Sequence, residues 1–88
     1  MVRVRVVVSG RVQGVYFRGS AAHHAEIESV GGFVRNRADG TVEAEFEGDR
    51  AAVDAMVSWC RAGPPGAAVE SVDVAEIAPE GVTEFAIL

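Results

Sequence analysis

The chain has 88 residues, 49% of them hydrophobic, with a formal net charge of −5 and a single cysteine. This length fits one domain with one core, and the negative charge disfavours nucleic acid and anionic membranes as partners. A lone Cys60 excludes an internal disulfide and fits a reducing compartment, and no stretch has the pattern of a signal peptide or a membrane span. We therefore expect one domain over residues 1–88, monomeric and cytoplasmic, with no membrane or nucleic-acid partner.

The first predicted strand covers residues 2–9, where apolar residues occupy every even position. It leads into a loop bracketed by two glycines, whose conformational freedom allows the loop to turn its N–H groups inward. Such amides before a helix N-terminus attract anions, and Arg18 on the first helical turn adds a guanidinium suited to phosphate. The pattern predicts a phosphate-binding loop, and its residues are Gly10, Arg11, Val12, Gln13, Gly14, Val15 and Tyr16.

A plainer interpretation of this stretch is a tight strand-to-helix turn with Arg18 solvated at the surface. The arginines on both sides of the loop, Arg11 and Arg18, favour the anion site. Residues 1–37 carry six arginines against two acidic residues, a net +4, whereas residues 38–88 carry two against eleven, a net −9. The loop has neither the Gly-Lys-Ser/Thr ending of a nucleotide P-loop nor the spacing of a dinucleotide fingerprint, so no nucleotide is expected.

The first predicted helix covers residues 17–29, with Phe17, Ala21 and Ala25 at four-residue spacing. A strand follows at residues 33–36, and a turn with Gly40 at positive φ connects it to the next. Asn36 ends the first of these strands, and from position alone its amide is expected to bond its own backbone.

The second half of the chain repeats the alternation of strand and helix. The strand at 41–47 points Val42, Ala44 and Phe46 inward and three glutamates outward, and Asp49 is a suitable N-cap for a helix at 50–62. The core stripe of this helix comprises Val53, Met56, Val57 and Cys60, with Trp59 at its border. Gly63 and the prolines after it end the helix, and strands are predicted at 71–77 and 83–88.

The order βαββαβ with an additional C-terminal strand predicts an α+β, ferredoxin-like sandwich. In this arrangement a mostly antiparallel sheet carries both helices on one face.

Two stretches resemble the signatures of the acylphosphatase family: residues 8–18, and residues 32–42 closing at Gly48. The likeness extends over nearly the whole chain, including residues 63–67. It implies the same fold and the metal-independent hydrolysis of the carboxyl–phosphate bond of acyl phosphates, giving a carboxylate and inorganic phosphate without a cofactor. It also implies that Arg18 binds phosphate and that Asn36 positions the attacking water, and Tyr16 and Phe17 become candidates for the acyl side, with Phe17 the better candidate for the core.

The sequence departs from the family pattern at the end of the first helix. Glu28 stands where a large aliphatic residue is expected, with Ile27 one place earlier, and Ser29 stands where glycine is usual. Either the helix shifts by one residue or a glutamate faces the edge of the core, and both remain open.

Several other candidates are rejected. His23 and His24 are adjacent and point about 100° apart on a helix, so they cannot share a metal, and no Cys/His cluster has zinc spacing. Cys60 is expected to be a buried hydrophobe because no activating base accompanies it.

Rival functions are a regulatory anion-binding domain, which would need the loop and Arg18 but not Asn36, and an RNA-binding module. RNA is disfavoured because the strand at 41–47 shows glutamates with one phenylalanine instead of paired aromatics. A third is an acylphosphatase-like domain that passes on a carbamoyl group within a larger enzyme; we expect a free-standing enzyme because the chain carries no further region.

Overall fold

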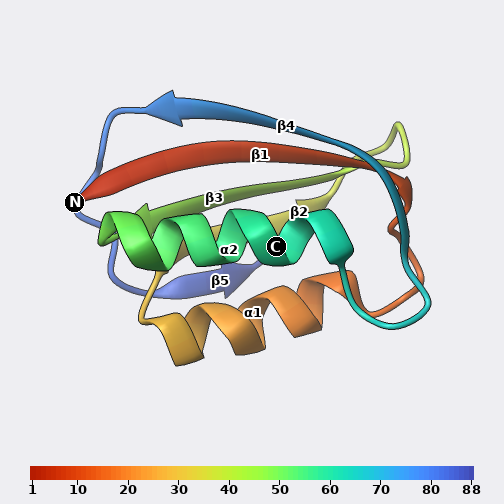
Figure 1. Ribbon diagram of the computed structural model, residues 1–88, viewed down its shortest axis with the longest axis horizontal. Helices are drawn as coiled ribbons and strands as arrows, with labels where there is room; N and C mark the ends of the chain where they lie inside the picture. The colour runs from red at the N-terminus through yellow and green to blue at the C-terminus, as the bar shows by residue number, and fades with distance from the viewer.

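The computed structural model describes all 88 residues. Its elements are β1 (Val2–Arg11), α1 (Phe17–Glu28), β2 (Gly31–Asn36), β3 (Val42–Gly48), α2 (Arg50–Ala62), β4 (Ala68–Ile77) and β5 (Phe85–Ile87). The sheet has the order β4-β1-β3-β2-β5, and both helices cover one face of it (Figure 1). This confirms the predicted ferredoxin-like α+β sandwich. With 12 and 13 residues, both helices fall short of the length that a membrane-spanning helix needs.

The sheet is antiparallel except at its C-terminal strand. β1 lies between β3 and β4 and runs antiparallel to both, while β5 runs parallel to β2, with Gly32 opposite Phe85. The predicted final strand is present but shorter, at 85–87 instead of 83–88. β4 begins three residues earlier than predicted because the register of β1 shifts between Ser9 and Gly10, which lets the pairing continue to Ala68.

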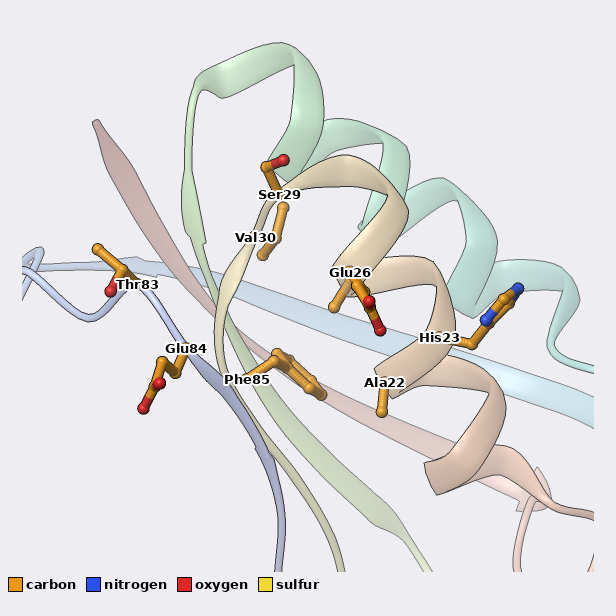
Figure 2. Close-up of a pocket in the computed structure, with 9 residues that line it drawn as sticks. Ala22, His23, Glu26, Ser29, Val30, Thr83, Glu84 and Phe85 are labelled. Atoms are coloured by element: carbon orange, nitrogen blue, oxygen red, sulfur yellow. The ribbon is translucent and has the colours of Figure 1, made fainter.

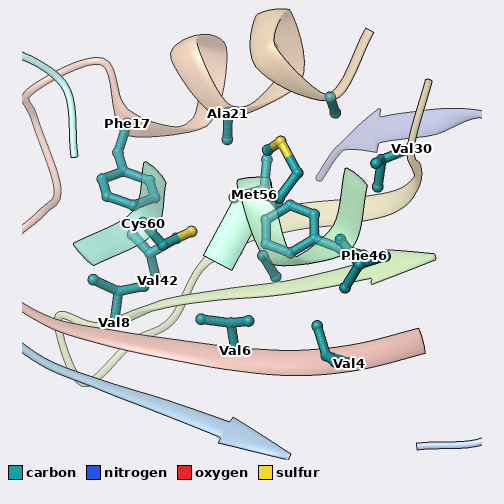
Figure 3. Close-up of a cluster of buried hydrophobic side chains, with 14 of the residues drawn as sticks. Val4, Val6, Val8, Phe17, Ala21, Val30, Val42, Phe46, Met56 and Cys60 are labelled. Carbon is teal, nitrogen blue, oxygen red and sulfur yellow. The ribbon is translucent and has the colours of Figure 1, made fainter. Parts of the chain in front are cut away.

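The core lies between the sheet and the two helices (Figure 3). Even-numbered residues of β1 and β3 point toward the helices, and Phe17, Ala21 and Ala25 of α1 meet them as predicted. From α2 the buried residues are Val53, Met56 and Cys60, with Val57 and Trp59 partly buried against the core. Burial raises the pKa of the Cys60 thiol to about 12, which agrees with its predicted role as a small hydrophobe. Asp49 holds the N-cap position of α2, but its side chain makes no capping hydrogen bond.

Helix α1 ends at Glu28, with Ser29 at the C-cap position. Ser29 adopts the left-handed conformation, with φ 59°, that a glycine would adopt more readily, and its N–H bonds the carbonyl of Glu26. The helix does not shift, because Ala25 and Val30 reach the core and Ile27 is exposed. Glu28 is exposed as the last residue of the helix and does not face the core.

The face of the sheet opposite the helices carries an ion-pair network. Glu43, Glu45 and Glu47 point to this face as predicted, yet only 2–8% of each residue is exposed. They are paired with arginines from the neighbouring strands: Arg3 with Glu45 and Glu47, Arg5 with Glu43 and Glu45, and Arg35 with Glu43.

Glu47 has a further role at the connection between β4 and β5. Its carboxylate accepts hydrogen bonds from the backbone N–H groups of Glu80 and Gly81, at 2.8 and 2.7 Å. The bond from Glu80 and the ion pair with Arg3 hold the pKa of Glu47 below its ordinary value. This carboxylate therefore fastens the segment that carries the chain across to β5.

Candidate functional site

The loop between β1 and α1 presents a row of unpaired backbone donors. Val12 and Phe17 are buried at its two ends, and Gly14 and Tyr16 take positive φ values of 74° and 63°. No backbone N–H of residues 12–16 donates to an acceptor within the protein. The first N–H groups of α1 also have no intrahelical partner. These donors lie at the positive end of the helix dipole, where an anion is stabilised.

A cleft with a volume of about 380 Å³ lies beside this loop. The residues that line it come from the loop, the first turn of α1 and the ends of β2 and β5: Gly14, Tyr16, Arg18, Gly19, Asn36 and Ile87. Arg18 and Asn36, predicted to bind phosphate and to position water, therefore share one cleft, although 18 positions separate them in the sequence.

Arg18 is partly buried and held by the end of the sheet. Its Nη1 donates a hydrogen bond to the carbonyl oxygen of Leu88 at 3.1 Å, and the N–H of Leu88 donates to Val34 at 2.9 Å. The guanidinium is thus anchored beside β2 instead of being freely solvated.

Asn36 lies on the helix-facing side of β2, two residues after the buried Val34. Its side chain makes no hydrogen bond within the protein, and the turn after it is closed by Thr41 donating to Asp39. The bond to its own backbone that position alone suggested is absent, so the amide is available to the cleft.

Gln13 joins the loop to the hairpin that carries Asn36. Its Nε2 donates to the carbonyl oxygens of Arg37 and Thr41, at 2.8 and 3.0 Å. Both hydrogens of one amide group therefore fix the distance between the loop and the hairpin. This contact could not be predicted from local patterns, because the two carbonyls lie 24 and 28 positions away.

The remaining residues of the predicted loop have other positions. Gly10 and Arg11 belong to β1 and pair with β4, and a Cβ at Gly10 would lie 2.2 Å from the carbonyl oxygen of Ala68. Arg11 is exposed outside the cleft lining, and Val15 packs against the core. Of the predicted loop, only Gly14 and Tyr16 line the cleft.

Two lining residues were not among the predicted site residues. Gly19 stands inside the first turn of α1, where a Cβ would lie 2.3 Å from Cζ of Tyr16. A glycine at that place in a predicted helix was the available signal. Ile87 reaches the cleft through the parallel pairing of β5 with β2, which no local sequence pattern predicts.

A larger cavity of about 800 Å³ lies between α1 and the segment that enters β5 (Figure 2). Its lining includes His23, Glu26, Glu84 and Phe85, and none of the predicted site residues. No group of three or more His, Cys, Asp or Glu side chains is placed to hold a metal ion.

Comparison with known proteins agrees with this geometry. The family model described as Acylphosphatase matches residues 4–87. The acylphosphatase of Gloeobacter violaceus is 53% identical over 99% of this chain and 94% of its own length, and that of Anaeromyxobacter dehalogenans is 60% identical over 91% and 86%. The crystal structure of acylphosphatase from Bacillus subtilis superposes with a TM-score of 0.96 at 37% identity, covering 100% of this chain and 99% of that one. The chain belongs to the acylphosphatase family.

Proposed function

We propose that this protein is an acylphosphatase that hydrolyses the carboxyl–phosphate bond of small acyl phosphates, releasing a carboxylate and inorganic phosphate. The observation that carries the proposal is that Arg18 and Asn36 line one cleft together with Gly14 and Tyr16, which belong to a loop whose backbone N–H groups are unpaired. Relatives that are named acylphosphatase match this chain over most of their length.

The loop and Arg18 would hold the phosphoryl group. Phosphoryl transfer proceeds through a loose transition state whose charge is spread over the equatorial oxygens, so positioning and charge stabilisation do most of the work. Backbone N–H groups at the start of α1 supply fixed dipoles, and the guanidinium supplies a permanent charge with a planar donor fork. The bond from Arg18 to Leu88 uses one nitrogen and leaves other donors for the substrate.

Asn36 would orient the attacking water. Its amide is not a useful base, so we propose that the water proton passes to an oxygen of the phosphoryl group. The leaving carboxylate has a conjugate acid with a pKa of about 4 to 5, so no general acid is needed. This accounts for a site without a histidine or a carboxylate in its lining.

We further propose that residues 1–88 act as one domain, as a monomer in the cytoplasm, without a metal ion or an organic cofactor. The positive field that a metal would otherwise supply comes from the guanidinium and the backbone dipoles. The partners are then the acyl phosphate and the phosphate product, with no nucleic acid or membrane.

The test is hydrolysis of benzoyl phosphate in excess chelator by the parent, Asn36→Ala and Arg18→Lys. Arg61→Lys, at an exposed position of α2, is the matched control for Arg18→Lys. We expect Asn36→Ala to lower kcat by about 10²- to 10³-fold while inorganic phosphate still inhibits competitively. Arg18→Lys keeps the charge but loses the fork, so both kcat and phosphate affinity fall. Turnover that disappears with chelator contradicts the metal-free mechanism, and phosphate binding without turnover in the parent favours an anion-binding domain.

A further inference from the structure

The cleft that holds Arg18 and Asn36 has an apolar side. Six large hydrophobic residues of the protein are exposed, and two of them, Tyr16 at 77% and Ile87 at 52%, line this cleft. The other four lining residues are the two polar groups and two glycines. Tyr16 and Ile87 are therefore the only apolar side chains that a group bound beside the phosphoryl group can contact there.

The position of the Tyr16 ring depends on two locally unfavourable residues. Tyr16 is one of two non-glycine residues with positive φ, a conformation that is strained for a bulky side chain. Gly19 lies within α1, where alanine would favour the helix more. A Cβ at Gly19 would lie 2.3, 2.5 and 2.7 Å from Cζ, Cε1 and Oη of Tyr16, so the ring lies directly over this glycine. Both features serve to hold the ring at the cleft.

Ile87 is fixed from two directions. Its strand pairs with β2 opposite Val34, and the following residue, Leu88, is hydrogen-bonded to both Val34 and Arg18. Phe85, two positions earlier, stacks on the core residue Phe46 with ring centroids 5.8 Å apart. Because side chains alternate along a strand, Ile87 faces the same side of the sheet as Phe85, toward α1 and the cleft.

From this geometry we infer that Tyr16 and Ile87 form an acyl subsite, which selects acyl phosphates with an apolar and preferably planar acyl group. This inference rests on the proposed function, because it says which residues contact the acyl group of the proposed substrate. An aromatic acyl group stacks on the tyrosine ring and contacts the isoleucine, whereas an acetyl group has no ring to stack and much less apolar area to bury.

The experiment compares kcat/KM for benzoyl phosphate with kcat/KM for acetyl phosphate. The variants are Ile87→Ala, which shortens the aliphatic wall, and Tyr16→Asn, which removes the ring but keeps a residue that tolerates positive φ. Ile27→Ala is the matched control, because Ile27 is 62% exposed in the last turn of α1, outside the cleft. We expect the benzoyl-to-acetyl ratio to fall about threefold to tenfold in each cleft variant and to stay unchanged in the control.

Affinities for benzylphosphonate and methylphosphonate, measured by calorimetry, provide a readout without turnover. The preference for the benzyl compound is expected to shrink in the same two variants by a similar factor. If both cleft variants hydrolyse the two substrates in the parental ratio and keep the parental phosphonate preference, the acyl subsite is refuted while the acylphosphatase proposal stands. If the folded parent turns over neither substrate, the proposed function fails and the subsite fails with it.

Discussion

The contact between Gln13 and the β2–β3 hairpin makes a quantitative prediction about catalysis. Gln13→Met removes both N–H donors at similar volume, so the loop loses its connection to the carbonyls of Arg37 and Thr41. Each carbonyl keeps one backbone donor, from Gly40 and Arg37 respectively, so neither is left unpaired. The loss of two neutral hydrogen bonds should therefore lower the free energy of unfolding by about 1–3 kcal/mol.

The larger effect is expected in kcat, because the hairpin carries Asn36 and, in the proposed mechanism, the loop holds the phosphoryl group. A displacement of about 1 Å between reacting groups can cost about 100-fold, so we expect kcat to fall about 10- to 100-fold. Benzoyl phosphate turnover and urea unfolding are measured for Gln13→Met, Asn36→Ala and the double variant. Ser58→Met, at an exposed position of α2, is the control.

A positioning residue that acts through Asn36 has a distinctive signature. In the Asn36→Ala background, Gln13→Met should lower kcat less than about twofold, because the group that it positions is already gone. Losses in kcat that multiply in the double variant would refute the reasoning and assign Gln13 a separate role.

Four further outcomes are expected. Glu47→Gln removes a carboxylate whose pKa is lowered in the fold by the bond from the Glu80 N–H and by Arg3. The stability that this carboxylate contributes is present above the ordinary carboxyl pKa and is lost as the pH falls through the lowered pKa. The urea midpoint of the variant should therefore depend less on pH in acid than that of the parent. Met56→Ala should lower the free energy of unfolding by about 2–5 kcal/mol in the same assay, since Met56 is 1% exposed; a loss below 1 kcal/mol would contradict its place in the core. Cys60, with a thiol pKa of about 12, should resist iodoacetamide at pH 8 until the protein unfolds, as followed by mass spectrometry. Gly19→Ala should leave stability equal or raise it by up to about 1 kcal/mol, because the exposed Tyr16 ring can move aside, yet it should lower the benzoyl-to-acetyl ratio; an unchanged ratio would mean that the ring position is immaterial.

The fold could be predicted from the sequence because local signals agree along most of the chain. Val53, Met56 and Cys60 follow helical spacing, and Val42, Ala44 and Phe46 follow strand alternation, and all six are buried as predicted. The start of β4 could not be predicted, because it depends on a register shift in β1, a property of the paired strands together.

The candidate site was predictable in large part, because Gly14, Tyr16, Arg18 and Asn36 were predicted and line the cleft, whereas Gly19 and Ile87 were not predicted. Arg18 and Asn36 lie in motifs that resemble a known family, and the structure brings both to one cleft. Gln13 and Ile87 act through neighbours that are distant in sequence, so no window of the chain contains both partners. The glutamates of β3 show the same limit, since alternation predicted their face but not the arginines that bury them there.

The bond between Arg18 and Leu88 has a consequence for the order in which the site is completed. It joins residues 70 positions apart, across a strand of three residues at the edge of the sheet. During synthesis residues 10–18 and Asn36 leave the ribosome before residues 85–88, so the nascent chain has the proposed catalytic groups before it has the strand that anchors the guanidinium. The same short strand has few bonds to break, so it can detach while the rest of the sheet remains paired. In the proposed mechanism, activity therefore appears only after residues 85–88 have been made, and it can be lost before the rest of the sheet unfolds.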